Sequence, residues 1–181
     1  AMSFASEGAA VVVTARHIEQ GHQVVDEIKN QGGAAIAFKA DVANRTDVHN
    51  LVKSALENFK AIHILVNNAG IVRQAPLLEM TEEDWDIVLD IDLKGVFNCT
   101  QAVLGHMMEQ QYGKIINISS IVGLGFSTTV GQASYATAKA GVVELTKVTA
   151  TEAGPYGINV NCIAPGLIMT EMAYSGLTKE E

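Results

Sequence analysis

The chain has 181 residues, which fits one domain with a substantial core. Hydrophobic residues make up 48% of it and charged residues only 18%, a balance that excludes an intrinsically disordered protein. A formal net charge of −8 without a basic cluster argues against a nucleic-acid partner, and the longest apolar runs are strand-sized, too short to cross a membrane.

Short apolar strands alternate with helical segments along the chain. In order, the sequence predicts a strand at 10–14, a helix at 17–30 that stops at Gly32-Gly33, a strand at 34–39, an amphipathic helix at 48–59 and a buried strand at 62–66. Thr81, with an acid three residues later, opens a long helix that we expect to reach Tyr112 with an interruption near Lys94-Gly95. A strand at 114–118, a helix at 132–152 and a strand at 158–163 complete the pattern. This alternation predicts an α/β fold, with a doubly wound parallel sheet covered by helices on both faces.

Cysteine and histidine show no pattern typical of a metal site. Cys99 and Cys162 lie far apart in the sequence, and we interpret both as reduced residues of the core. The five histidines, at positions 17, 22, 49, 63 and 106, lack metal-ligand spacing. The first residues also lack the basic-then-apolar layout of a signal peptide, so we expect a cytoplasmic protein without a metal.

A tyrosine and a lysine four residues apart carry the clearest chemical signal. Tyr135 and Lys139 lie on one face of the predicted helix, and Ser120 stands a short way upstream at the end of an apolar run. An ammonium close to a phenol stabilises the phenolate, so we expect the pKa of Tyr135 to fall from about 10 toward neutrality. A tyrosine tuned in this way exchanges a proton with a substrate oxygen, to which Ser120 can donate a hydrogen bond. For the pair alone, an ordinary exposed Tyr and Lys on a helix is the alternative.

Four motifs follow one another in a characteristic order. They are Asn67-Asn68-Ala69-Gly70, Ser119-Ser120-Ile121-Val122-Gly123, and the stretches 131–141 and 161–166. In this order they resemble the short-chain dehydrogenase/reductase family, with bacterial 3-oxoacyl-[acyl-carrier-protein] reductases among the similar members. The resemblance runs from Ala1 to about Thr170. It implies a single Rossmann-like domain over residues 1–181, with three layers in the order α/β/α.

The resemblance implies a catalytic set of four residues. Tyr135 is the general acid/base, Lys139 lowers its pKa and holds the nicotinamide ribose, and Ser120 orients the substrate carbonyl or hydroxyl. Asp92 stands where the family usually has an asparagine that serves a proton relay. Its carboxylate can serve that relay, but it can also compete for the Lys139 ammonium.

The resemblance also implies a dinucleotide cofactor. NAD-preferring members have an acid at the position of Ala15, whereas here Ala15 is followed by Arg16, whose guanidinium can bind the 2′-phosphate of NADP. NADP is therefore favoured over NAD, with a solvated strand-end residue as the alternative for Arg16. The other cofactor-binding residues that the resemblance implies are Asp41, Val42, Asn67, Ala69, Gly70, Tyr135, Lys139, Pro165, Gly166 and Thr170.

The family's first strand and its glycine-rich turn have no counterpart in this sequence. The segment 1–9 resembles the back half of the helix that follows that turn, and the residues after Thr170 are too few for the family's lid and last strand. In the family the first strand lies at the centre of the sheet, so a chain without it would have unpaired backbone groups and fold poorly. We therefore expect the sequence to be a piece of a longer protein.

Together these features predict an oxidoreductase that transfers a hydride between NADP(H) and a ketone or secondary alcohol, with a 3-oxoacyl-type ketone as one candidate. A catalytically inactive dinucleotide-binding sensor or scaffold is the alternative, and the intact Ser120, Tyr135 and Lys139 argue against it. Expected partners are a small carbonyl or alcohol substrate and further copies of the chain, in a homodimer or homotetramer built on helices 81–112 and 132–153. Nucleic acid and membrane are not expected.

Overall fold

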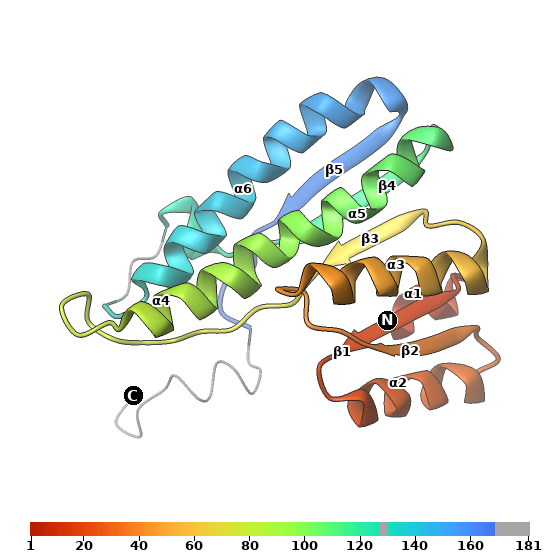
Figure 1. Cartoon of the computed structure of the whole chain (residues 1–181), viewed down its shortest axis with the longest axis horizontal. Helices are drawn as coiled ribbons and strands as arrows, with labels where there is room; N and C mark the ends of the chain where they lie inside the picture. Colours follow the sequence, from red (N-terminus) through yellow and green to blue (C-terminus); the bar gives the residue numbers. More distant parts are fainter. Residues whose placement is uncertain (127–129, 169–181) are drawn as a thin grey trace. The chain divides into compact units, whose positions relative to one another are not determined.

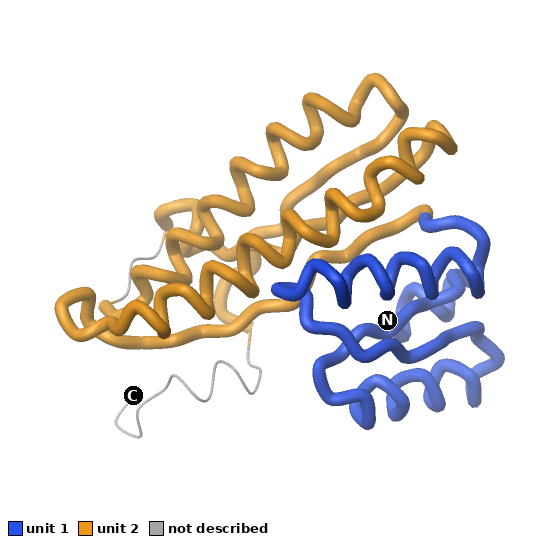
Figure 2. Tube along the Cα trace, viewed as in Figure 1, with its two compact units in different colours: residues 1–62 blue, residues 63–181 orange. Residues whose placement is uncertain are grey.

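The structure is a computed structural model that describes residues 1–126 and 130–168 (Figure 1). The chain divides into two compact units, residues 1–62 and residues 63–181 (Figure 2). In both units parallel strands alternate with helices, which confirms the predicted α/β class. The assignment of the whole chain to one domain stays a prediction.

The first unit packs its helices against a two-stranded parallel sheet. Its elements are α1 (Met2–Ser6), β1 (Val11–Ala15), α2 (Ile18–Asn30), β2 (Ala35–Lys39) and α3 (Arg45–Phe59). The two strands pair in register from Val11 beside Ala35 to Ala15 beside Lys39. The chain turns after α2 at Gly32, whose φ of 82° lies in the left-handed region that glycine adopts without a steric penalty. The predicted end of this helix is therefore confirmed.

The second unit contains a three-stranded parallel sheet in the order β3-β4-β5. Its elements are β3 (Ile64–Asn67), α4 (Glu82–Leu89), the π-helical turn η1 (Asp90–Lys94), α5 (Gly95–Glu109), β4 (Gly113–Ile118), the 3₁₀ turn η2 (Ile121–Leu124), α6 (Ala133–Ala153), the 3₁₀ turn η3 (Gly154–Tyr156) and β5 (Ile158–Ile163). The central strand β4 is the best buried of the three, with every second residue in the core.

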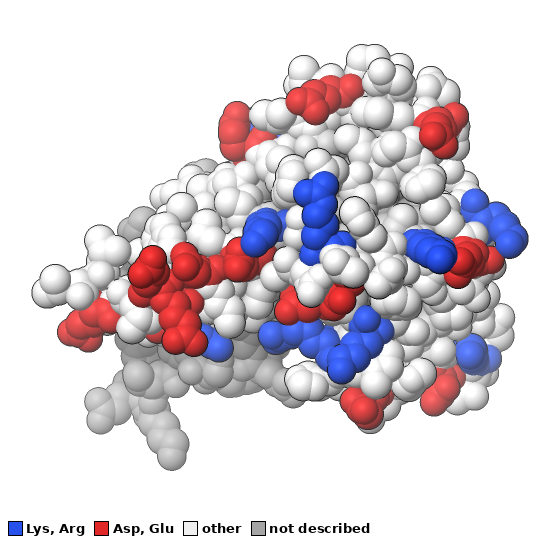
Figure 3. All heavy atoms as spheres, viewed as in Figure 1, with Lys and Arg blue, Asp and Glu red and all other residues white. Residues whose placement is uncertain are grey.

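The long helix predicted to begin after Thr81 is present and is interrupted as expected. The Thr81 hydroxyl accepts a hydrogen bond from the Asp84 backbone N–H and donates one to the Asp84 carboxylate at 2.8 Å. Acidic side chains gather over this helix start (Figure 3), where they face the positive end of the helix dipole. At η1 the backbone N–H of Gly95 donates to the carbonyl of Asp90, five residues earlier, so that α4 and α5 are joined through one wide turn.

One expectation about burial is wrong. The strand near 62–66 was predicted to be buried, but Ile64 and Val66 in β3 are each 40% exposed. These two side chains lie on the same face of the strand, since alternate residues point the same way. Among the described residues β3 pairs with β4 alone, and its apolar sequence does not reveal that one of its faces remains partly open.

Among the described helices, none is long and apolar enough to cross a membrane. The expected cytoplasmic location stays a prediction. Cys99 and Cys162 are both free thiols, and only Cys99 is fully buried. The expectation of two core cysteines thus holds for Cys99, whereas Cys162 near the end of β5 is only partly covered.

Candidate functional site

The candidate site of the second unit lies where its strands end. The carboxyl ends of parallel strands meet at one edge of a sheet, the usual position of ligand sites in α/β folds. The segments that follow β4 and β5 are fixed to each other there. The backbone N–H of Ser119 donates to the carbonyl of Ile163 at 2.8 Å, and that of Ile121 donates to the carbonyl of Pro165 at 3.0 Å.

Helix α6 brings Tyr135 and Lys139 to this edge, as their spacing predicted. The ammonium of Lys139 lies 5.5 Å from the centre of the Tyr135 ring and donates a hydrogen bond to the carbonyl of Ile118 at 3.0 Å. Lys139 is only 4% exposed, whereas Tyr135 is partly exposed. The first turns of α6 therefore hold a buried cation under a phenol that remains open to solvent.

Ser120 completes the predicted triad. It forms a hydrogen bond to Tyr135 that favours the phenolate, and its hydroxyl accepts from the backbone N–H of Val122 at 3.3 Å. The neighbouring Ser119 donates its hydroxyl to the carbonyl of Lys139 at 2.8 Å, which fixes the end of β4 to α6. A Cβ at Gly123 would lie 2.6 Å from the Lys139 carbonyl carbon, so only glycine allows η2 to approach α6 this closely.

Asp92 lies inside the same centre. It belongs to the π-helical turn, is 0% exposed, and its Oδ2 lies 3.1 Å from Lys139 Nζ. Its Oδ1 accepts a hydrogen bond from the backbone N–H of Ile71 at 2.8 Å. Burial raises the pKa of Asp92, while Lys139 and the Ile71 N–H lower it. The predicted competition of this carboxylate for the lysine ammonium is thus a contact in the structure.

One expectation about Tyr135 is wrong. The pKa of Tyr135 is raised, not lowered. Burial is the largest cause, the hydrogen bond from Ser120 acts in the opposite direction, and the negative charge of Asp92 raises the pKa further. The spacing of Tyr135 and Lys139 indicates only the effect of the lysine charge. In the structure burial disfavours the phenolate, and the lysine charge is paired with the Asp92 carboxylate.

Asn67, a predicted cofactor-binding residue, directs its side chain to other buried polar side chains of the second unit. Its buried amide donates to Thr100 Oγ1 at 3.1 Å and to Asn117 Oδ1 at 2.8 Å. Asn117 in turn donates to Thr146 Oγ1 at 2.9 Å, so four buried side chains connect β3, β4, α5 and α6. This chain of hydrogen bonds was not predicted from the sequence. A sequence signal for it exists, namely an asparagine among the isoleucines of strand β4.

The other cofactor predictions fall into both units. In the second unit Ala69, Pro165 and Gly166 follow β3 and β5, and Ala69 and Gly166 are exposed. A Cβ at Gly70 would lie 2.8 Å from Asp92 Oδ2, so this glycine packs directly on the buried ion pair.

In the first unit, Arg16 is exposed directly after β1. Asp41 and Val42 follow β2, and one carboxylate oxygen of Asp41 accepts from the backbone N–H of Ala43 at 2.9 Å. Thr170 lies outside the described residues. The cofactor roles of all these residues stay predictions.

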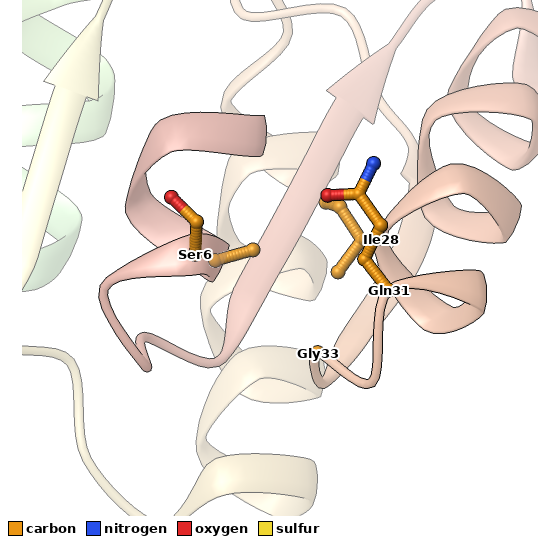
Figure 4. Close-up of a pocket in the computed structure, with 5 residues that line it drawn as sticks. Ser6, Ile28, Gln31 and Gly33 are labelled. Atoms are coloured by element: carbon orange, nitrogen blue, oxygen red, sulfur yellow. The ribbon is translucent and has the colours of Figure 1, made fainter.

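A cavity of about 180 Å³ lies in the first unit (Figure 4). It is lined by Ala5, Ser6, Ile28, Gln31 and Gly33. None of these side chains is titratable, so the cavity offers no acid or base for catalysis. In the described part of the chain, no group of three or more His, Cys, Asp or Glu residues is arranged to hold a metal ion.

Comparison with known proteins gives consistent matches. A model of the short chain dehydrogenase family matches residues 1–181. The chain is 46% identical over 172 residues to the (2S)-[(R)-hydroxy(phenyl)methyl]succinyl-CoA dehydrogenase subunit BbsD of Thauera aromatica, and 47% identical over 173 residues to a 3-oxoacyl-[acyl-carrier-protein] reductase of Synechocystis. These alignments cover 95% of this chain and 68% and 69% of the two relatives.

Among solved structures, a gluconate 5-dehydrogenase from Burkholderia cenocepacia, in complex with NADP and tartrate, is similar with a TM-score of 0.88 and 37% identity. The match covers 94% of this chain and 66% of that one. A short chain dehydrogenase from Mycobacterium avium is similar with a TM-score of 0.87 and 39% identity, over 64% of its length. The chain thus spans about two thirds of the length of these proteins.

Proposed function

Because the chain belongs to the short-chain dehydrogenase/reductase family, as its motifs indicated, we propose that it takes part in hydride transfer between NADP(H) and a ketone or secondary alcohol. The observation that carries the proposal is the arrangement of Ser120, Tyr135 and Lys139 at the carboxyl end of β4. A proton donor that is partly open to solvent stands there beside a second hydroxyl and above a buried cation.

The chemistry of the residues present fits a dinucleotide. An exposed guanidinium at Arg16 suits a phosphate, and an ammonium at Lys139 suits ribose hydroxyls. The relative bound to NADP supports this choice of cofactor. The nicotinamide, when bound, supplies or accepts the hydride at the substrate carbon.

The residues of this chain handle the proton and the substrate oxygen. In ketone reduction, Ser120 donates a hydrogen bond to the carbonyl oxygen and so helps to orient it for attack. The Tyr135 hydroxyl gives its proton to the same oxygen as the C–H bond forms, which completes the alcohol and leaves a phenolate. The phenolate regains a proton from solvent. In alcohol oxidation each of these transfers runs in the opposite direction.

A 3-oxoacyl-type ketone is the substrate class that we favour. Several relatives are named 3-oxoacyl-[acyl-carrier-protein] reductases. In addition, apolar side chains on the segments that follow Ser120 and Pro165 remain exposed in the second unit, where Phe126 is 79% and Leu167 is 74% exposed. An apolar acyl chain bound there would remove this surface from water.

We further propose that the protein self-associates as a homodimer or homotetramer through α5 and α6. The exposed apolar residues Phe97 on α5 and Val148 on α6 support this arrangement. Sedimentation as a monomer at micromolar concentration would contradict it.

The proposed function is tested with Tyr135→Phe and a matched control, Tyr156→Phe, which removes the hydroxyl of an exposed tyrosine in η3. The assay follows the loss of NADPH absorbance on addition of a 3-oxoacyl thioester. Tyr135→Phe should reduce the rate by about 10²–10⁴-fold and keep NADPH binding, because the hydroxyl serves only in proton transfer. The control should keep the wild-type rate.

Retention of more than a tenth of the activity in Tyr135→Phe would overturn the assigned role. If the wild type bound NADPH but did not oxidise it when a ketone was added, the second candidate, a dinucleotide-binding sensor or scaffold, would be favoured instead.

A further inference from the structure

Two opposite charges are buried together in the candidate active site. Asp92 is 0% exposed and Lys139 is 4% exposed, with 3.1 Å between Oδ2 and Nζ. Each charge is also tied to the backbone of another segment. Lys139 donates to the carbonyl of Ile118 at the end of β4, and Asp92 accepts from the N–H of Ile71. The pair is therefore fixed on both sides.

The surroundings leave the carboxylate little freedom to move away. A Cβ at Gly70 would lie 2.8 Å from Asp92 Oδ2 and 3.3 Å from Lys139 Nζ, so the glycine backbone closes over the pair. A buried ammonium without a counter-ion is strongly unfavourable, and Asp92 supplies that counter-ion. The same contact cancels much of the positive charge that the lysine would otherwise direct at Tyr135.

Among the described residues, the titratable groups of this centre come from two elements. The π-helical turn contributes Asp92, and α6 contributes Lys139 and Tyr135. The ends of β4 and η2 present serine hydroxyls and backbone groups, and the segment at 70–71 presents backbone alone. Asp90 and Lys94 in the same turn form their own exposed pair at 2.9 Å. The charge seen by Tyr135 is thus set by the balance of Asp92 and Lys139.

We propose that Asp92 is a positioning residue that holds the Lys139 ammonium and offsets its charge, so that Tyr135 keeps its proton at neutral pH, as a proton donor in ketone reduction requires. This inference rests on the proposed role of Tyr135 as proton donor. Reduction needs the phenol, whereas alcohol oxidation needs the phenolate as the base. A site whose phenol persists to alkaline pH supports reduction throughout the neutral range, and it confines oxidation to alkaline solution.

The kinetic test compares the pH dependence of kcat/KM for alcohol oxidation in the wild type, in Asp92→Asn and in Asp90→Asn. Asp92→Asn keeps the shape of the side chain and removes the charge. It should move the midpoint of the rising alkaline limb to lower pH. Asp90→Asn removes a carboxylate two positions away that faces solvent, and its profile should match the wild type. An unchanged midpoint in Asp92→Asn, or the same shift in both variants, would overturn the proposal.

A second measurement needs no turnover, and the wild type alone can refute the inference. With the tyrosine Cζ labelled by ¹³C, the phenol of Tyr135 is titrated by NMR in the cofactor-free protein, and its signal is assigned by its loss in Tyr135→Phe. The wild-type midpoint should lie above that of free tyrosine, about 10, and Asp92→Asn should lower it. A wild-type midpoint below 10 would refute the inference even if Asp92→Asn failed to fold. Absence of ketone reduction together with the expected titration would refute the proposed function alone.

Discussion

Replacing Thr146 by valine should destabilise the protein through the loss of one buried hydrogen bond. Thr146 on α6 is 5% exposed, and its Oγ1 accepts from Asn117 Nδ2 at 2.9 Å while donating to the carbonyl of Val142 at 2.7 Å. Valine has nearly the same shape as threonine, so the substitution opens no cavity. It leaves the amide of Asn117 in the core without its acceptor.

The structure supplies a matched control for this substitution. Thr149, one turn later on the same helix, is 6% exposed and also donates to a carbonyl four residues back, that of Leu145 at 2.8 Å, but it accepts no hydrogen bond from Asn117. Thr149→Val therefore has the same helix-propensity and packing changes without the unpaired amide. The difference between the two variants should be about 1–3 kcal/mol, the cost of an unsatisfied buried polar group.

The free energy of unfolding of both variants can be measured by urea denaturation, with thermal melts as a second measure. A difference of 1 kcal/mol corresponds to about 2–4 °C in Tm for a chain of this size. Equal free energies of unfolding for Thr146→Val and Thr149→Val would show that the Asn117–Thr146 hydrogen bond does not stabilise the protein, which would refute this prediction.

Three further outcomes are expected. Burial raises the pKa of the Cys99 thiol from 9.0 to about 11, so the thiol ionises at lower pH in the unfolded chain than in the folded one. The free energy of unfolding should therefore fall as pH rises from 9 to 11, by up to about 2.7 kcal/mol. Urea denaturation of Cys99→Ala should show a smaller fall over this range. Gly123→Ala should lower Tm because its Cβ meets the backbone of Lys139, whereas Gly105→Ala, an open position in α5, should raise Tm slightly. Arg16→Ala should weaken NADPH binding by roughly ten- to a hundredfold and NADH binding little, measured by fluorescence titration; equal weakening would remove the reason for favouring NADP.

The order of strands and helices could be predicted from the sequence because it depends on local patterns. The cap at Thr81, the glycine after α2 and the pairing of Tyr135 with Lys139 on one helix face each involve residues within a few positions of one another. The interruption of the long helix was also predicted, although its π-helical geometry was not. Such features need no knowledge of the tertiary fold.

What the sequence did not reveal depends on segments that meet only in the folded chain. The direction of the Tyr135 pKa shift follows from burial and from the position of Asp92, and neither is readable from the Tyr-Lys spacing. The role of Asn67 likewise depends on Asn117, which lies on the neighbouring strand. In both cases the residue type was noticed, but its partner was not known.

The π-helical turn at Asp90–Lys94 also sets the rotational phase of the helix on either side of it. Val88 and Met107 are nineteen positions apart, which on an uninterrupted α-helix would separate their directions by about 100°. Both are nevertheless 0% exposed. The wide turn absorbs one residue, and the remaining eighteen make five whole turns, so both side chains face the same core. Deleting one residue from the turn would therefore give an uninterrupted α-helix that keeps both apolar faces toward the core, whereas forcing the full sequence into a regular α-helix would rotate α4 against α5 by about 100° and turn one of the two faces toward solvent.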